Sequence, residues 1–483
     1  MPAAAPPIAL GPLAPALMLT ATTVVLLLLD LLPPRDRKGH LGVVALGGVL
    51  GALVLVVLQW GHGGQAFRGM VVLDDYALFF DVVIAYATGL VLLLSMDYTR
   101  RNGIEAGEYY ALICFSATGM MLMASAGDLI VIFLALELMS LSLYVLAGFF
   151  SGRLTSGESS MKYFLLGAFA SGFLLYGIAL IYGATGTTSV SQMALASGGV
   201  LGDPLMAAGV GFLLVGFSFK IASVPFHMWA PDVYEGAPTS VAALIATGSK
   251  AAAFAALLRV LLLGLQPAQE QWAALLWVVA VLTMTVGNVV AIAQSNLKRM
   301  LAYSSVAHVG YALVGVVAGG ALGHGAVLFY LLVYTFTTVG AFGVILLLER
   351  GRREAVNLSD YSGLATRHPI LALVLSLFLL SLVGIPPTAG FVGKFYLFGA
   401  AIRAGYIWLA VLAVLNSAVA AYYYLRLIVY MYMREPEAVP TAYAPSLAGG
   451  LALGIALWAV FQLGLMPAPL FDLAQATVAP LVR

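Results

Sequence analysis

The chain has 483 residues, of which 62% are hydrophobic and only 9% are charged, whereas soluble domains typically carry about 25% charged residues. This composition excludes an ordinary soluble protein, and the net charge of +1 without charge blocks gives no reason to expect nucleic acid. The single cysteine, Cys114, excludes an internal disulfide and any iron–sulfur cluster or cysteine-bound zinc built from this chain alone. We therefore expect no cofactor and no metal on this chain, with any redox chemistry left to partner subunits.

Apolar segments long enough to cross a bilayer follow one another along the whole chain. A crossing helix needs about 20 apolar residues for a hydrocarbon core of about 30 Å. No basic residue precedes the first segment, which predicts a retained helix rather than a signal peptide. The predicted fold is an all-α integral membrane protein of about fourteen transmembrane helices, at 8–32, 41–60, 76–95, 109–125, 129–150, 161–184, 205–229, 241–265, 272–293, 300–318, 326–348, 369–400, 406–433 and 447–465.

Basic residues in the loops predict the orientation, because cytoplasmic loops are enriched in lysine and arginine. With an outer N-terminus, only Arg68, Arg403 and Arg483 fall outside, and an even helix count places the C-terminus outside too. The arginine-rich, Ala-, Gly- and Leu-rich composition favours a bacterial source, so we expect the plasma (inner) membrane with both termini on the periplasmic side. The residues predicted inside are Arg35, Arg37, Lys38, Arg100, Arg101, Arg153, Lys162, Lys298, Arg299, Arg350, Arg352, Arg353, Arg367 and Arg434.

Prolines interrupt two of the predicted helices. Pro225 lies in the seventh segment, and Pro386 and Pro387 lie in the twelfth. Proline removes a backbone donor and breaks a helix, and a pair of broken membrane helices indicates a transport site between two related halves. The loop at 230–237 between the seventh and eighth segments has no basic residue, an exception that topology does not explain.

Five cations remain within the predicted spans. Arg259 and Arg426 lie near helix ends, where long side chains can snorkel to the headgroups. Lys220 and Lys250 lie too deep for this, and Lys394 adjoins a break. Because lysine can lose its proton when buried and arginine cannot, the three lysines are candidates for proton transfer.

Glu137, in the fifth segment, is the one deep glutamate. A central charge costs about 2.5–3.5 kcal/mol on insertion scales, so these groups must be paired, neutral or hydrated. A purely structural Glu–Lys pair could explain Glu137 and one lysine, but would leave two lysines over. His227 and His308 could extend a proton path or be neutral packing residues. We expect Asp81 to be interfacial and the remaining histidines, His40, His62, His324 and His368, to lie in loops.

Neither the dinucleotide nor the P-loop nucleotide fingerprint occurs, so energy must come from a gradient or a partner. Three runs carry a family resemblance: FKIASVPFHMWAPDVYEGAPT at 219–239, NLKRMLAYSSVAH at 296–308 and GIPPTAGFVGKF at 384–395. They resemble the N subunits of the proton-translocating NADH:quinone oxidoreductases, respiratory complex I. The PDVYEGAP wording, a lysine at position 394 and an end after fourteen helices favour the N type over the M and L types.

The resemblance implies a proton relay in which Glu137 tunes Lys220, Lys250 is the central group and Lys394 is terminal. It also implies two five-helix inverted repeats, helices 4–8 and 9–13, with helices 7 and 12 broken. The corresponding divisions are 1–125 (helices 1–4, the fourth beginning the first repeat), 105–265 (first repeat), 271–433 (second repeat) and 447–483 (last helix and tail). Expected partners are the other membrane-arm and peripheral-arm subunits, with FMN, iron–sulfur clusters, NADH and quinone bound there.

Two other functions stay open at this point. A subunit of a multi-subunit sodium/proton antiporter would use the same residues for ion exchange without redox partners. Alternatively, the chain is a structural quinone-site or assembly scaffold whose buried charges only fix packing.

Overall fold

The computed structural model describes residues 10–32, 38–102, 106–150, 152–196, 203–349, 356–436 and 446–482. A short hairpin, β1 (Gly64–Ala66) and β2 (Val71–Leu73), joins α2 to α3. The helices of the first half are α1 (Ala14–Asp30), α2 (Gly39–Gln59), α3 (Asp75–Asn102), α4 (Gly107–Ala124), α5 (Leu129–Ala147), α6 (Leu154–Thr185), α7 (Val190–Ala196), α8 (Pro204–Ile221), α9 (Trp229–Gly236), α10 (Thr239–Ala246) and α11 (Gly248–Arg259). Those of the second half are α12 (Gln269–Ile292), α13 (Leu297–Ala318), α14 (Gly320–Leu348), α15 (Leu364–Arg367), α16 (Pro369–Val383), α17 (Ala389–Arg403), α18 (Ile407–Met433), α19 (Leu447–Leu465) and α20 (Ala468–Val478).

Every predicted segment coincides with one helix or with two consecutive helices, so the all-α membrane fold is confirmed. Within the described residues, 12 helices are long and apolar enough to cross a membrane. The two predicted segments outside this set are α4, whose first turn contains Glu108 and two tyrosines, and the pair α16 and α17 of 15 residues each. The number of fourteen crossings, the inverted repeats and the divisions derived from them stay predictions.

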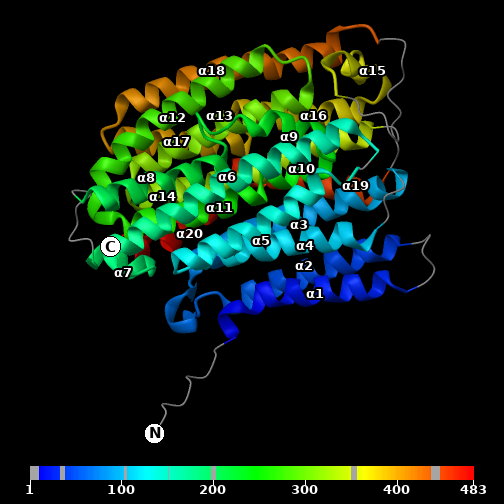
Figure 1. The fold of residues 1–483 in the computed structure, drawn as a ribbon. Coiled ribbons are helices and arrows are strands. Elements are labelled where there is room, and N and C mark those ends of the chain that lie inside the picture. The colour runs from blue at the N-terminus through cyan, green and yellow to red at the C-terminus, as the bar shows by residue number, and fades with distance from the viewer. Residues whose placement is uncertain are drawn as a thin grey trace.

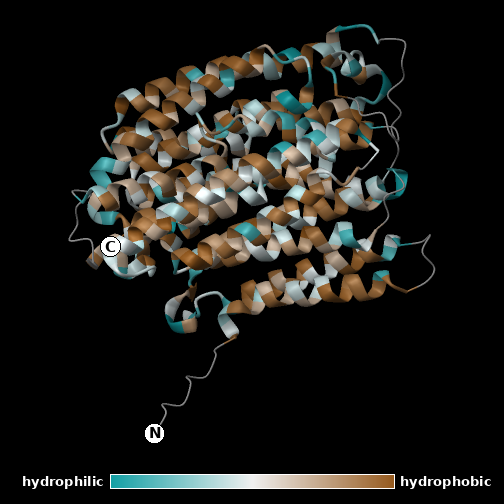
Figure 2. Ribbon diagram, in the orientation of Figure 1, coloured by the Kyte–Doolittle hydropathy of each residue, from teal (hydrophilic) through white to brown (hydrophobic). Residues whose placement is uncertain are grey.

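The helices lie side by side along a common direction, with α1 and α2 at one edge of the bundle and α18 at the other (Figure 1). Apolar residues cover the middle of the helices and polar residues gather at their ends (Figure 2), which is the pattern that a bilayer requires. The helices α3, α10, α11, α13 and α14 are almost wholly buried, whereas α1, α2, α12, α18 and α19 leave apolar side chains exposed. The core therefore lies around α14 and α11.

Both predicted helix breaks are present. The helix α8 ends at Ile221, where Ala222 takes a left-handed conformation (φ 60°), and Pro225 lies before α9 begins. The helix α16 ends at Val383, the following Gly384 is also left-handed (φ 92°), and Pro386 and Pro387 precede α17. The predicted segment 241–265 is confirmed as a span, but it contains an interruption that was not predicted, at Thr247 (φ −116°, ψ −78°) between α10 and α11. No proline marks that break, so the sequence carried no strong signal for it.

Two arginines were predicted to reach toward the lipid headgroups, but the structure shows that they bind polar groups inside the protein instead. Arg259 is 1% exposed and makes two hydrogen bonds of 2.8 Å to Asp74 and one of 3.1 Å to the Ala124 carbonyl. The part-buried Arg426 donates to the carbonyls of Ile292 (2.9 Å) and Gln294 (2.6 Å) at the end of α12. Polar partners inside the protein therefore replace the headgroups that snorkelling would have supplied.

Three other predictions about polar residues are also wrong. Asp81 is buried rather than interfacial, and His324 lies buried in α14 rather than in a loop. Lys298, predicted in a loop, is buried in the first turn of α13 and donates to the Ala237 carbonyl at 2.8 Å. Distance along a segment did not reveal these positions, because neighbouring helices cover them. The predicted inside residues Arg35, Arg37, Arg350, Arg352 and Arg353, and the outside residue Arg483, fall outside the described residues.

Candidate functional site

Lys220 is 2% exposed and lies in the last turn of α8, just before the first break. Its Nζ donates to Ser140 Oγ on α5 at 2.9 Å and to Tyr163 OH on α6 at 3.2 Å. Tyr163 in turn stacks on Trp229, with ring centroids 4.6 Å apart, and Trp229 donates to the Phe219 carbonyl at 2.9 Å. The aromatic rings of Tyr163 and Trp229 therefore pack beside the break, and Tyr163 holds the lysine in place.

Glu137 lies on α5 one turn before Ser140, so both side chains leave the same face of that helix. Its carboxylate accepts a hydrogen bond from Ser171 on α6. Among the ion pairs of the described residues, none joins Glu137 to Lys220. The two predicted partners are therefore neighbours held by different hydroxyl groups rather than a closed salt bridge.

A small cavity lies between these two hydroxyl groups. Ser140, Ser171 and Lys220 all line it, and its volume is about 10 Å³. That volume is close to the minimum that holds one water molecule, about 10–15 Å³. Lys220 and Ser171, the residue that donates to Glu137, therefore face a common cavity that is large enough for one water molecule, which could carry a proton between them.

Lys250 is 1% exposed and lies in the first turn of α11, directly after the break at Thr247. Its Nζ donates to Ser305 on α13, to Oγ at 2.5 Å and to the carbonyl at 3.2 Å. Tyr334 of α14 donates to the same Ser305 Oγ at 2.6 Å. The lysine therefore opens onto a hydroxyl-rich contact between α13 and α14.

His308 continues this polar path along α13. The two nitrogens of its ring lie 2.6 Å from Tyr330 OH and 3.2 Å from Tyr424 OH, and the ring packs 5.1 Å from that of Tyr334. His227, in contrast, lies in the first break beside Tyr303, and its Nδ1 has no hydrogen-bond partner. The structure thus brings His308, but not His227, into contact with the polar side chains around Lys250.

Lys394 is 4% exposed and lies on α17, just after the second break. Its Nζ donates at 2.9 Å to both the Leu382 and Val383 carbonyls and at 2.8 Å to Ser417 Oγ on α18. Breaking α16 frees C-terminal carbonyls of this kind, so the lysine occupies the place of the missing helical donors. All three N–H donors of this ammonium group have acceptors.

Tyr311 connects Lys394 to the middle of the protein. Its ring centroid lies 4.6 Å from Lys394 Nζ, and its hydroxyl accepts a hydrogen bond from Asn288 at 3.0 Å. Asn288 also accepts from Tyr423, whose ring neighbours that of Tyr424 at 4.4 Å. A nearly continuous series of polar side chains therefore runs from Lys250 to Lys394.

The sequence missed these serines and tyrosines. Hydroxyl and aromatic residues are common in membrane helices, so only charged side chains stand out by their cost at depth. The one signal available was the helical spacing of serine and tyrosine residues on the helix faces that carry the lysines. In the described part of the chain, no group of three or more histidine, cysteine, aspartate or glutamate side chains could hold a metal ion.

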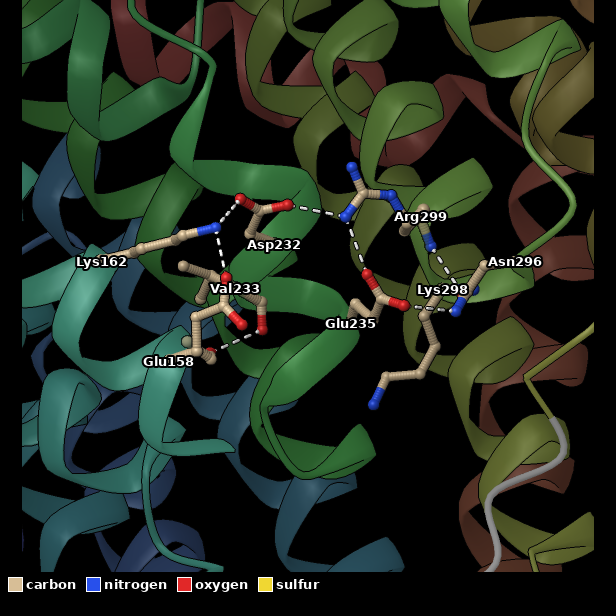
Figure 3. Close-up of polar contacts among 9 residues, drawn as sticks. Glu158, Lys162, Asp232, Val233, Glu235, Asn296, Lys298 and Arg299 are labelled. Atoms are coloured by element: carbon tan, nitrogen blue, oxygen red, sulfur yellow. Dashed lines mark hydrogen bonds and ion pairs between the residues drawn. The ribbon is translucent and has the colours of Figure 1, made fainter. Parts of the chain in front are cut away.

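An ionic cluster explains the loop that lacked basic residues (Figure 3). Asp232 on α9 pairs with Lys162 of α6 and with Arg299 of α13, each at 2.6 Å, and Glu235 pairs with Arg299 at 2.7 Å. Burial opposes ionisation, but the hydrogen bonds from Lys162 and Arg299 prevail and lower the pKa of Asp232 below its usual value. The acids of α9 are therefore neutralised by the two helices that flank it.

Replacing Asp232 by asparagine should lower the stability of the protein by about 0.5–1 kcal/mol at pH 7, because the cluster is partly exposed. The lowered pKa means that this contribution is full above the ordinary aspartate pKa and is lost as the pH falls through the folded-state value. We expect wild type and Asp232→Asn to differ in melting temperature at pH 7 and to converge below about pH 4. A difference that persists or grows in acid would contradict this role.

Buried lysines beside helix breaks, connected by hydroxyl groups, define an ion-translocating class of membrane protein. A sequence model described as "NADH:quinone oxidoreductase/Mrp antiporter, TM" matches residues 126–420. NADH-quinone oxidoreductase subunit N of Trichlorobacter lovleyi is 49% identical over 96% of this chain and 96% of its own length. The Chloroflexus aggregans subunit N is 47% identical over 99% of this chain and 98% of its own.

Solved structures agree with this assignment. A chain of respiratory complex I from Thermus thermophilus superposes with a TM-score of 0.81 at 38% identity, covering 95% of this chain and 99% of that one. A chain of the Mrp complex from Dietzia has a TM-score of 0.86 at 23% identity, covering 98% and 97%, and shows the shared fold alone. The chain belongs to the NADH:quinone oxidoreductase/Mrp antiporter family, and within it to the N subunits of NADH-quinone oxidoreductase.

Proposed function

We propose that this chain, as a non-redox membrane-arm subunit of NADH:quinone oxidoreductase, translocates protons through Glu137, Lys220, Lys250 and Lys394. The observation that carries the proposal is the row of three lysines, each at most 4% exposed, with hydroxyl acceptors and in close proximity to a helix break. Lysine can exchange a proton at such a site and arginine cannot. The nearly full-length identity to N subunits favours this function over an antiporter subunit.

In this proposal, a change in the electric field at Glu137, caused by redox chemistry in partner subunits, begins each cycle of proton translocation. NADH, FMN, iron–sulfur clusters and quinone belong to partner subunits in this proposal, and their redox chemistry reaches this chain only as a change of field. When Glu137 and Lys220 are brought together across the small cavity lined by Ser140 and Ser171, the protonated lysine is stabilised. When they separate, Lys220 gives up its proton to the interior path.

Proton transfer then continues toward the second half. The helices that carry Lys220 and Lys250, α8 and α11, pack against each other, and the buried hydroxyl of Ser249, the residue before Lys250, has no hydrogen-bond partner among the described residues. Beyond Lys250, the proton follows Ser305, the His308 ring and its tyrosine partners toward Lys394. His308 is thus a relay group in this proposal, whereas His227 has no contact that assigns it a step.

We also propose that the chain lies in the bacterial inner membrane with both termini on the periplasmic side. The described basic residues support this orientation, since Arg100 and Arg101 end α3, Arg153 precedes α6 and Arg367 ends α15. An alternating path from an outer N-terminus gives these positions to the inner side, where basic residues are enriched. Cysteine accessibility at the N-terminus and beside Arg153 would test it.

Replacing Lys250 by arginine tests the relay with the positive charge retained. We expect proton pumping by the reconstituted complex to fall about tenfold or more, because arginine does not release its proton. The measurement is NADH-driven acidification of proteoliposomes in sodium-free buffer, with assembly checked on native gels. Copurification of NADH-binding and iron–sulfur subunits with this chain is the matching composition test.

Two results would contradict the proposal. Normal pumping by an assembled Lys250→Arg complex would remove Lys250 from the path. Sodium-dependent proton exchange without NADH, by a chain that copurifies with no redox subunit, would instead support an antiporter.

A further inference from the structure

A second group of buried charges lies outside the lysine row, at the opposite end of α11 from Lys250. Asp74 caps the N-terminus of α3 by accepting from the Ala77 N–H at 2.8 Å, and its two oxygens bind the two terminal nitrogens of Arg259 at 2.8 Å each. Arg259 also lies over the ring of Tyr76, 4.9 Å from the ring centroid. The carboxylate side chain is 28% exposed and the guanidinium 1%, so this pair connects the aqueous edge to the interior.

Two complementary atoms near this pair have no hydrogen-bond partner. One is the Arg259 Nε, a donor, and the other is the Asp81 Oδ1, an acceptor. Asp81 is 4% exposed, and its charge interacts with those of Asp74 and Arg259. Within the described residues, no hydrogen bond satisfies the buried Asp81 Oδ1. A buried carboxyl group without partners is costly when ionised, so a function rather than stability accounts for it.

The charge balance says which form Asp81 takes at rest. Asp74 and Arg259 already neutralise each other through two hydrogen bonds. An ionised Asp81 would therefore add an uncompensated negative charge to the interior, whereas a protonated Asp81 adds none. The resting group is the neutral acid, with Arg259 Nε available as a donor once the carboxylate forms.

Asp81 on α3 lies at a similar depth in the bundle to Lys250 on α11. The helices α3 and α11 run antiparallel, since Asp74 meets Arg259, Tyr76 donates to the Ala255 carbonyl at 2.8 Å, and Ala87 approaches Gly248. Asp81 thus lies level with the stretch of α11 that includes Lys250. Counted along the helices, it lies about 10 Å inward of Asp74, and Lys250 lies about 13 Å inward of Arg259. Lys250 leaves the other side of α11 toward Ser305, so α11 itself separates the two groups.

We propose that Asp81 is a proton-binding group that exchanges its proton with the aqueous side on which Asp74 lies, in step with the charge of Lys250. When Lys250 becomes protonated, the positive charge favours the Asp81 carboxylate; the O–H bond of Asp81 breaks and the proton passes to water beside Asp74. The carboxylate then accepts a hydrogen bond from Arg259 Nε. When Lys250 loses its proton, Asp81 takes one back from the same water and returns to the neutral acid.

The inference rests on the proposed proton translocation by this chain, and the test uses the intact complex. In NADH-induced infrared difference spectra we expect a carbonyl band of a neutral carboxylic acid that Asp81→Asn removes and Asp81→Glu shifts. The Asp81→Asn complex should also translocate about half or fewer of the protons per NADH, while Asp81→Glu restores most of them. Asp97→Asn, at the other end of α3 where Asp97 pairs with Arg100 at 2.6 Å, should leave both readouts unchanged.

The outcomes separate the two proposals. An unchanged carbonyl band or an unchanged proton ratio in Asp81→Asn, while Lys220→Ala still stops pumping, overturns the role of Asp81 and leaves the proposed function intact. Unchanged pumping in both variants overturns the proposed function itself. If Asp81→Asn does not assemble, the frequency shift of the band in Asp81→Glu decides, and a band that does not move rejects the inference.

Discussion

Replacing Lys220 by alanine is expected to abolish the proton pumping of this chain coupled to NADH oxidation. The alanine removes the lysine that lines the small cavity beside Ser140 and Ser171, and leaves Ser140 Oγ and Tyr163 OH without their donor. Hydroxyl groups alone do not hold a proton as an ion at neutral pH, so the path would be interrupted. The measurement is acidification of proteoliposomes that contain the assembled complex, normalised to NADH oxidised.

A conservative variant separates proton transfer from charge and packing. Lys220→Arg keeps a cation of similar length but cannot release its proton, so it should also stop pumping. Arg403→Ala is the matched control, because Arg403 is an exposed cation at the end of α17. Pumping by Lys220→Ala at the wild-type ratio, or full rescue by arginine, would show that Lys220 carries only charge or packing.

Replacing Gly390 by alanine is expected to destabilise the second break more than any other single methyl group. A Cβ at Gly390 would lie 1.8 Å from the backbone oxygen of Ser381 and 2.7 Å from its carbonyl carbon. Neither atom belongs to a flexible side chain, so α16 and α17 would have to separate. Overpacking of this kind costs about 1–3 kcal/mol, and we expect the upper end of that range because the backbone cannot move aside.

The same separation would disturb function. Lys394 lies one turn after Gly390, and it depends on the Leu382 and Val383 carbonyls that end α16. We expect Gly390→Ala to lower the melting temperature of the complex in detergent and to reduce pumping in whatever fraction assembles.

The control lies on the same helix. At Gly399, no atom lies within 4 Å of the place that a Cβ would take, and alanine there should be neutral or stabilising by up to about 1 kcal/mol. Equal melting temperatures for Gly390→Ala and Gly399→Ala would show that the two half-helices can part at little cost.

Much of the site followed from the sequence because charge is rare within a bilayer. Lys220, Lys250 and Glu137 stood out by depth and Lys394 by its place beside a break. Pro225, Pro386 and Pro387 marked the two breaks, since each removes a backbone donor. The fold class followed from the length of the apolar segments. These inferences hold for any packing of the helices, because they depend on lipid rather than on neighbours.

Packing between neighbouring helices decided the burial and the partners of the other polar residues. The sequence placed Arg259 near a helix end and Asp81 at an interface, whereas tertiary packing buried both around Asp74. The family resemblance implied that Glu137 tunes Lys220, and only the structure shows that each of them has its own hydroxyl partner. The absence of basic residues from the loop at 230–237 is explained only by the structure, in which Lys162 and Arg299 from two other helices pair with Asp232 of that loop.

By itself, the sequence determined that buried lysines lie on broken membrane helices, because the cost of a charge or a missing donor in lipid depends on local composition. Only the tertiary structure decided which hydroxyl, carbonyl or carboxylate each charge meets. Those partners come from helices far apart in the chain, such as α5 and α6 for Lys220 or α18 for Lys394. Hydrogen bonds act over about 3 Å, and no pattern along one helix specifies which neighbour lies within that distance.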